Sequence, residues 1–228
     1  MEKYKNIVFI PARGGSKSIP GKNIKEINGK PLIYWAIMAS CRCRFTDMVY
    51  VATDDRLIRE TVEGFGIQKL KAVGRSEDSA TDTASTELAM LQFAKEHEFE
   101  NIILVQATSP MLTSQELEEG IQKFREPGID SVLSVVRQRR FCWERCAGNR
   151  ARPLNYDVVR RPRRQEFEGF FVENGAFYIT SKEALLRTGC RLSGNIGMVE
   201  MQEDSYYEID EPKDWEIVEH LLKLRESR

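Results

Sequence analysis

Short apolar runs alternate along the chain with longer segments in which apolar residues recur at helical spacing. The runs have the length and β-branched content of strands buried in a parallel sheet. They cover residues 7–10, 48–52, 102–105 and 131–136. The segments between them predict helices, for example over 31–40 and 86–97. This alternation predicts an α/β fold with a doubly wound, mostly parallel sheet.

Local signals predict where several elements begin. Asp54 or Asp55 is expected to cap the helix after the second strand, and residues 113–116 read as a capping box with a structural role. The Asn-Gly pair at 174–175 predicts a turn that enters a strand. The last helix is expected to bury Ile217 together with its other apolar residues.

Composition and charge exclude several classes of protein. The chain has 228 residues, enough for one α/β domain with a modest insertion, and a net charge of -1 argues against a general nucleic-acid or membrane binder. No apolar run approaches the roughly 20 residues needed to span a bilayer, and the first run is too short for a signal peptide. We therefore expect a cytoplasmic protein. The five cysteines fit structural thiols better than a disulfide scaffold or a zinc site.

The loop after the first strand, residues 11–23, carries adjacent glycines and several cations. Backbone amides can approach phosphate oxygens where Gly14 and Gly15 lack a Cβ, and Arg13 and Lys22 can neutralise phosphate charge. The spacing matches neither the P-loop nor the dinucleotide motif G-x-G-x-x-G. From the residues alone, a polyphosphate site and a plain surface turn both stay open.

The order of residues in this loop is more specific. Pro-Ala-Arg-Gly-Gly-Ser-Lys, then Ile-Pro-Gly-Lys-Asn, then Gly-Lys-Pro-Leu-Ile resembles the signature of the acylneuraminate cytidylyltransferases, which make CMP-sialic acid from CTP and a nine-carbon keto sugar acid. The resemblance implies a Rossmann-like fold in which this loop wraps the triphosphate of CTP. It implies nucleotide contacts for Arg13, Gly14, Ser16, Lys22 and Asn23.

A polar segment at 75–85, RSEDSATDTAS, precedes the helix predicted from residue 86. Composition alone describes it as a surface loop that caps this helix. In the family that the chain resembles, an arginine followed by a Ser/Thr-Asp-Thr-Ala-Ser segment holds the cytosine base and ribose. The resemblance therefore implies that Arg75 and Ser85 contact cytidine.

Three further residues are implied to bind the sugar acid. Gln106 follows a buried strand, where an amide needs hydrogen-bond partners, and it lies in a Gln-x-Thr-Ser-Pro motif that contacts the sugar acid in the family. Asn174 and Tyr178 belong to an Asn-Gly-Ala-x-Tyr motif that lines the sugar pocket. A turn and a core tyrosine are the structural alternative for this motif.

Between residues 137 and 164 arginines are dense and few acidic residues oppose them. A solvated loop, a nuclear-import or RNA-binding patch and an anion-binding subunit contact are the three interpretations. The resemblance favours the third, because the family inserts a small dimerisation subdomain here, over 137–171, within one nucleotidyltransferase domain of residues 1–228. It implies a homodimer in which Arg164 binds the carboxylate of the acid. Some vertebrate members use a similar basic run for nuclear import, so a nuclear location is an alternative.

Two carboxylates precede the last helix. Glu208 and Asp210 alternate along an extended segment, so both can point to one face and hold Mg²⁺. The family usually has Asp-Ile-Asp where this chain has Glu-Ile-Asp, which makes Asp210 the firmer metal ligand.

The resemblance implies a CTP-dependent cytidylyltransferase that forms a CMP-activated nine-carbon 2-keto sugar acid and pyrophosphate. Mg²⁺ is the expected cofactor, and CTP, the sugar acid and a second copy of the chain are the expected partners, with no nucleic acid or membrane. Arg13, Lys22 and Asp210 are the expected catalytic residues. A transferase for the eight-carbon acid Kdo and a non-catalytic nucleotide-binding protein on the same fold are the alternatives.

Overall fold

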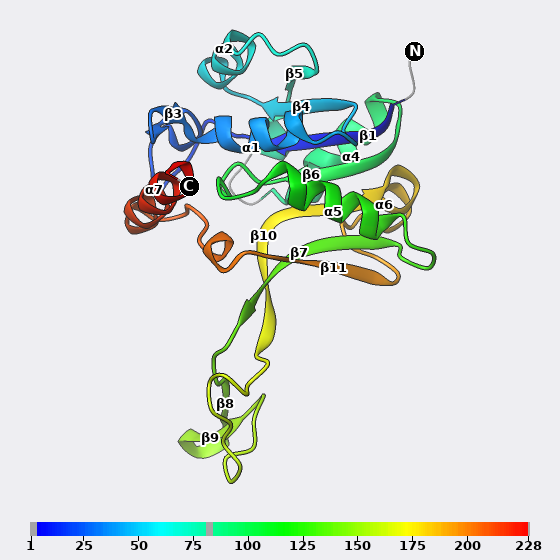
Figure 1. Ribbon diagram of the computed structural model, residues 1–228. Coiled ribbons are helices and arrows are strands. Elements are labelled where there is room, and N and C mark those ends of the chain that lie inside the picture. Colours follow the sequence, from blue (N-terminus) through cyan, green and yellow to red (C-terminus); the bar gives the residue numbers. More distant parts are fainter. Residues whose placement is uncertain (1–3, 81–83, 228) are drawn as a thin grey trace.

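A seven-stranded sheet forms the centre of the computed structural model, which describes residues 4–80 and 84–227 (Figure 1). In the order in which they lie in the sheet, the strands are β11 (Ile196–Met201), β7 (Ser131–Gln138), β10 (Phe170–Ser181), β6 (Phe99–Val105), β1 (Tyr4–Pro11), β4 (Met48–Thr53) and β5 (Leu70–Gly74). Neighbouring strands are parallel except at β10, which is antiparallel to β6 and to β7. The predicted fold class is confirmed.

Helices cover both faces of this sheet. The α-helices within the described residues are α1 (Leu32–Arg42), α2 (Arg56–Gly64), α3 (Glu77–Ala80), α4 (Thr86–Glu96), α5 (Ser114–Phe124), α6 (Lys182–Thr188) and α7 (Pro212–Glu226). Successive residues of a strand point to opposite faces, so Val8 and Ile10 pack with α1, α2 and α5, whereas Ile7 and Phe9 pack with α4 and α6. Helix α7 buries Trp215 against the loops at one end of the sheet.

The strand order reverses beside β1. This strand pairs with β4 on one side and with β6 on the other. In open parallel sheets, the crevice at such a reversal, outside the carboxyl ends of the strands, is where ligands bind. The two loops that start there are residues 11–23, after β1, and the segment that begins at Gln106, after β6.

Several local predictions are confirmed and others are wrong. The Asp55 side chain accepts a hydrogen bond from the Ile58 N–H at 2.9 Å and caps α2, and Thr113 and Glu116 form the predicted capping box of α5. Ile217 is 41% exposed, because it lies on the solvent side of α7, so its predicted burial is wrong. Strand β5 was not predicted, since it is a half-exposed edge strand without an apolar run.

The predicted Asn-Gly turn is a bulge within β10. The register between β10 and β7 shifts between Glu173 and Tyr178, and Gly175 has a φ of +66°. A left-handed residue in mid-strand lets the chain absorb the extra residues without leaving the sheet. The bulge lies where β10 passes the carboxyl end of β6, since the Gln106 N–H donates to the Ala176 carbonyl at 3.1 Å.

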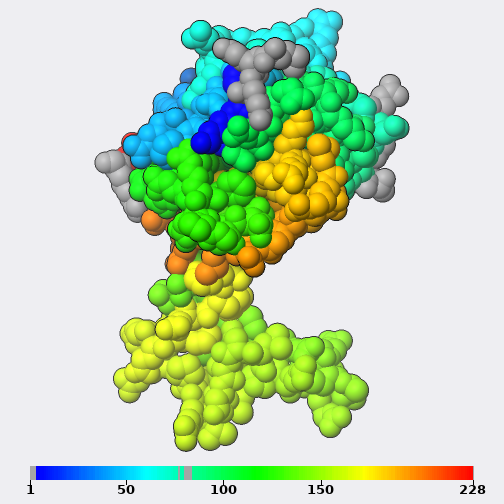
Figure 2. Space-filling view, turned by 90° about the vertical axis from the view of Figure 1, so that its right-hand side faces the viewer, coloured from blue at the N-terminus to red at the C-terminus, as the bar shows by residue number. Residues whose placement is uncertain are grey.

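An arm made of residues 139–169 leaves the sheet between β7 and β10 and projects away from the body (Figures 1 and 2). It contains the hairpin β8 (Trp143–Cys146) and β9 (Arg150–Pro153). Its small core packs Phe141 against Tyr156 and Phe167, with ring centroids 4.3 and 4.8 Å apart.

Two short strands, β2 (Glu26–Ile27) and β3 (Lys30–Pro31), form a separate hairpin before α1. Among the helices within residues 4–80 and 84–227, none is long and apolar enough to cross a membrane.

Candidate active site

The loop after β1 is tied to the start of α2. The Gly14 N–H donates to Asp54 Oδ1 at 3.1 Å, and a Cβ on Gly14 would lie 2.5 Å from Asp55 Oδ2. Asn23, which is 8% exposed, donates from Nδ2 to the Arg13 carbonyl at 3.0 Å. Gly14 is therefore required by close packing, and Asn23 holds the backbone of the loop from inside.

The Ser16 N–H donates to the Gly14 carbonyl at 3.1 Å, which makes a tight turn at the glycine pair. Ser16 itself is half-exposed. A short turn with backbone amides and a hydroxyl at its rim suits an anionic oxygen.

Lys22 connects this loop to the segment before α7. Its ammonium donates to the Ile209 carbonyl at 2.9 Å and to Asp210 Oδ1 at 3.1 Å. The Lys22 side chain is 14% exposed, whereas that of Asp210 is 67% exposed. The Ile209 N–H donates to the Thr108 carbonyl at 2.9 Å, which fixes the segment beside the end of β6. The ends of β1 and β6 thus share one site with Asp210.

Glu208 lies at the inner side of the same segment. Burial raises the pKa of its carboxyl to about 7, and the negative charge of Asp210 adds to the rise, while Lys22 opposes it. A Cβ on Gly175 would lie 2.7 Å from Glu208 Oε1, so the β10 bulge provides the space for this carboxylate. Two carboxylates that repel each other are a suitable pair of ligands for a divalent cation.

Arg75 follows β5 and lies close to the same loop. Burial lowers the pKa of its guanidinium and the charge of Arg13 adds to this effect, whereas Asp54 opposes it. Arg75 donates from Nη2 to the Ser79 carbonyl and from Nε to Ser79 Oγ at 3.3 Å. Arg75 is therefore near enough to Asp54, which accepts from the Gly14 N–H, and to Arg13 for their charges to act on it.

Ser85 is the N-cap of α4, where its hydroxyl accepts a hydrogen bond from the Leu88 N–H at 3.2 Å. This is the role that composition alone predicted for the segment. The residues before it, 81–83, belong to the motif of the sequence analysis but lie outside the described residues.

The residues expected to bind the sugar acid line β10 and the end of β6. Tyr178 is 4% exposed and its hydroxyl donates to Glu173. Asn174 is 1% exposed and donates from Nδ2 to the Ser205 carbonyl at 3.1 Å and to Met201 Sδ at 3.3 Å. Its Oδ1 atom is buried and has no hydrogen-bond partner within residues 4–80 and 84–227. Gln106 is half-buried at the carboxyl end of β6.

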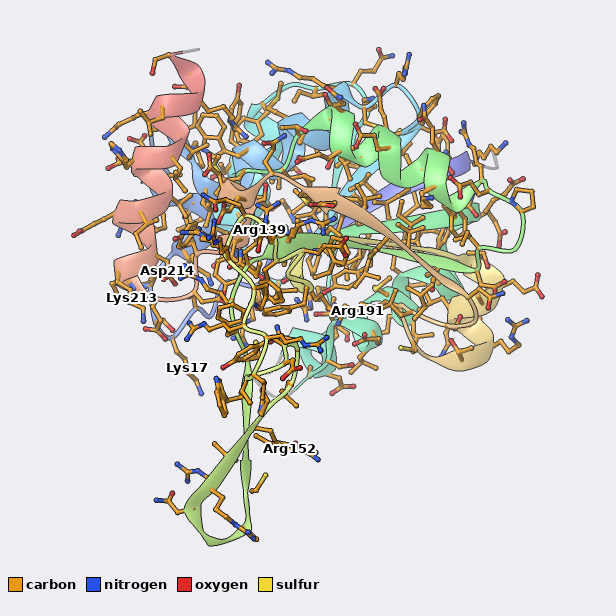
Figure 3. All side chains as sticks on the ribbon, turned by 60° about the horizontal axis from the view of Figure 1, so that its bottom comes forward. Lys17, Arg139, Arg152, Arg191, Lys213 and Asp214 are labelled. Atoms are coloured by element: carbon orange, nitrogen blue, oxygen red, sulfur yellow. The ribbon has the colours of Figure 1, made fainter. Side chains whose placement is uncertain are left out.

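The fold separates Arg164 from the expected site residues in the body of the molecule. It is exposed on the arm, which points away from the body that holds Lys22 and Asp210 (Figure 1). Figure 3 shows the same arrangement, with Arg139 near the base of the arm and Arg152 further along it.

Sequence reasoning assigned no role in the site to Asp54 and Glu173. Asp54 could have been found, because it follows a parallel strand at the edge of the sheet where the loop of residues 11–23 begins. Glu173 had no comparable signal in the sequence, because the bulge between Glu173 and Tyr178 is what brings their side chains into contact.

A comparison with protein families decides the affiliation of the chain. The model of a family described as cytidylyltransferase matches residues 7–228. The chain belongs to this family. It is 37% identical over 215 residues to N-acylneuraminate cytidylyltransferase A of Danio rerio, which covers 92% of this chain and 49% of that protein. It is 28% identical over 226 residues to N-acylneuraminate cytidylyltransferase of Streptococcus agalactiae serotype V, which covers 96% of this chain and 54% of that protein.

The chain spans about half the length of the curated relatives that it matches. Among solved structures, it is similar to a CMP:2-keto-3-deoxy-manno-octonic acid synthetase complexed with CTP, with a TM-score of 0.71, 21% identity and coverage of 97% of this chain and 99% of that chain. It is also similar to a 4-diphosphocytidyl-2C-methyl-D-erythritol synthase from Anaerococcus prevotii, with a TM-score of 0.72, 12% identity and coverage of 96% of both chains. At these identities the two likenesses show the fold alone.

Proposed function

We propose that this protein is a CTP-dependent cytidylyltransferase that joins CMP to a nine-carbon 2-keto sugar acid and releases pyrophosphate. The observation that carries the proposal is the contact of Lys22, from the cationic glycine loop, with Asp210 at 3.1 Å beside the half-buried carboxylate of Glu208. In this family, such a site can hold a triphosphate on one side and a metal on the other. Relatives named N-acylneuraminate cytidylyltransferase support the nine-carbon acid as the substrate class.

Arg13 and Lys22 would carry the charge of the triphosphate. Lys22 is half-buried, so little water competes with the phosphate oxygens for its ammonium. Both cations would stabilise pyrophosphate as it leaves, and backbone amides near Gly14 would orient the chain of phosphates. The sugar hydroxyl would release its proton to solvent and attack the α-phosphorus, as the bond from this phosphorus to the departing pyrophosphate breaks in line with the attack, so positioning provides most of the catalysis.

The carboxylates of Asp210 and Glu208 would hold Mg²⁺. Their fit to the ion follows from the chemistry of the donors, because carboxylate oxygens are the hard ligands that Mg²⁺ takes, and a cation would offset the repulsion between Asp210 and Glu208. Among the described residues, no group of three or more His, Cys, Asp or Glu side chains could hold a metal. Mg²⁺ commonly takes one or two carboxylates and fills its shell with substrate phosphates and water. Bound there, it would polarise the α-phosphoryl group.

We further propose that Gln106, Asn174 and Tyr178 contact the sugar acid. The Asn174 Oδ1 atom is buried and has no hydrogen-bond partner in the part of the chain that the structure describes, and a hydroxyl of a bound sugar would satisfy it. The Tyr178 hydroxyl donates to Glu173, which belongs to the same strand, β10, and this hydrogen bond fixes the position of the tyrosine ring.

The arm supports a homodimer in which Arg164 reaches the acid in the partner's site. Val159 is 87% exposed and Leu154 59% exposed, and burying such side chains favours association. In sedimentation velocity the full chain is expected to run as a dimer. A monomer at micromolar concentration would contradict this part of the proposal. The cytoplasmic location and the nuclear alternative stay predictions.

Pyrophosphate release with CTP and Mg²⁺ tests the function. The acid panel is Neu5Ac, KDN, legionaminic acid and Kdo, and ATP replaces CTP as the control nucleotide. Release with CTP and one nine-carbon acid, but not with ATP, is the expected result. Release with Kdo alone would favour the second candidate, which the likeness in fold to the CMP:2-keto-3-deoxy-manno-octonic acid synthetase suggests. If no acid gives pyrophosphate release, both the nine-carbon and the Kdo function are refuted.

A further inference from the structure

Arg191 lies in the loop between α6 and β11, outside every motif of the sequence analysis. Its side chain is only 18% exposed, and Figure 3 shows it in the body of the molecule, apart from Arg152 on the arm. A guanidinium in this position needs partners, because burial without them is costly. Its partners come from two different elements of the fold.

The first partner is Glu87, in the first turn of α4. Arg191 Nε donates to Glu87 Oε1, and the Glu87 side chain is 20% exposed. The hydrogen bond from Arg191 lowers the pKa of Glu87. Ser85, the N-cap of the same helix, stands two residues earlier in the chain. Arg191 therefore binds the first turn of α4, the helix that follows the polar segment at 75–85.

The second partner is the ring of Tyr178. The Arg191 guanidinium carbon lies 4.9 Å from the centre of this ring, a distance suited to a cation–π contact. The Tyr178 hydroxyl donates to Glu173, so Arg191 holds the face of the ring and Glu173 holds its hydroxyl. The charge of Glu173 also raises the pKa of Tyr178, after burial as the larger cause.

The loop that carries Arg191 is itself fixed. The Ser193 N–H donates to Ser131 Oγ at 3.1 Å, and the Ser131 hydroxyl donates back to the Ser193 carbonyl at 2.9 Å. The Asn195 N–H donates to Asp130 Oδ2 at 2.7 Å. These bonds tie the loop to the start of β7, so Arg191 projects from a rigid support.

From this geometry we infer that Arg191 is a positioning residue that joins the start of α4 to Tyr178, so that Ser85 and the acid pocket are held in one arrangement. The inference rests on the proposed function, in which Tyr178 contacts the acid, and on the family resemblance, which implies that Ser85 contacts cytidine. In the proposed arrangement, Arg191 contacts neither CTP nor the acid. It acts through Glu87 on one side and through the tyrosine ring on the other.

Four variants and a control test the inference in the full chain. The variants are Arg191→Met, Arg191→Lys, Glu87→Gln and the double variant with Arg191→Met. Arg187→Met is the control, because Arg187 is an exposed arginine of α6 that pairs only loosely with Glu183, at 3.7 Å. Pyrophosphate release gives kcat and the KM of each substrate, and thermal unfolding reports the integrity of the fold.

Arg191→Met is expected to raise the KM of the acid roughly tenfold and that of CTP by a smaller factor, because Tyr178 loses its support directly and Ser85 only through Glu87. Arg191→Lys should lie between the wild type and Arg191→Met, since lysine keeps the charge but not the planar stack. The double variant should match Arg191→Met, because Glu87 acts through Arg191. A lowered melting temperature with both KM values unchanged, or additive effects in the double variant, would overturn the inference.

A readout without turnover separates this inference from the proposed function. The ring ¹³C resonances of Tyr178 should shift in Arg191→Met and stay in place in Arg187→Met. If the wild type turns over no acid, the proposed function fails, and these resonances still decide whether Arg191 positions the ring. Unmoved resonances in Arg191→Met would overturn the inference in either case.

Discussion

Replacing Glu208 by glutamine should stabilise the folded protein at neutral and alkaline pH while it reduces turnover. Burial and the charge of Asp210 raise the pKa of Glu208 from its ordinary value of 4.5 to about 7. The folded state therefore binds this proton more tightly than the unfolded state does. Stability from this group is fully present below the ordinary pKa and is lost as the pH rises through about 7.

The size of the effect follows from the two pKa values. At about 1.4 kcal/mol for each pH unit, the rise from 4.5 to about 7 corresponds to about 3 kcal/mol of destabilisation once Glu208 is ionised. Glu208 is partly exposed, and solvent screening lowers the expected figure to about 1–2 kcal/mol. Glutamine keeps the shape of the side chain beside Gly175 and never ionises.

Thermal unfolding of the wild type and Glu208→Gln at about pH 5 and about pH 8 measures this effect. The melting temperature of Glu208→Gln should exceed that of the wild type by roughly 2–8 °C at the higher pH and by little at the lower pH. Glu203→Gln, which changes an exposed carboxylate in the same region, is the control. An equal gain at both pH values, or a loss at the higher pH, would refute the reasoning. Pyrophosphate release should fall in Glu208→Gln under all conditions, because one proposed metal ligand is gone.

Three further variants test the rest of the site. Asp210→Asn should lower pyrophosphate release by at least about 100-fold, while thermal unfolding changes little because the Asp210 side chain is 67% exposed. Asp204→Asn is the matched control, and retained turnover in Asp210→Asn would exclude the metal role. Gly14→Ala should raise the KM of CTP and destabilise the fold by about 1–3 kcal/mol, because its Cβ would lie 2.5 Å from an oxygen of Asp55. Urea titration measures this destabilisation, and an unchanged midpoint of unfolding would contradict the packing argument. Arg164→Ala should raise the KM of the acid and leave sedimentation unchanged, and an unaltered KM would exclude its contact with the carboxylate.

Much of the fold could be predicted from local patterns in the sequence. The apolar runs at 7–10 and 48–52 lie within β1 and β4, because a strand buried on both faces must be apolar at every position. Asp55 caps α2 as predicted, because a carboxylate before a helix satisfies N–H groups that the helix itself leaves free. The loop of residues 11–23 was also readable, since its order of glycines and cations is continuous in the chain.

The sequence could not predict features that depend on contacts between distant segments. Asn174 and Gly175 form a bulge instead of a turn, because β10 pairs with β6 and β7 and the sheet absorbs the extra residues. The pKa of Glu208 depends on its burial beside Asp210 and on the space above Gly175. Arg191 becomes important only because folding places it between Glu87 and Tyr178, which no periodicity of the chain records.

The sequence by itself thus determined the alternation of strands and helices, the helix caps and the cationic loop, because each of these depends on residues that are neighbours in the chain. The tertiary structure decided which side chains meet at the ends of the strands, how tightly Glu208 holds its proton and what fixes the ring of Tyr178. Those properties arise from burial and from charges brought close by folding, and both are set by the packing of segments far apart in the sequence.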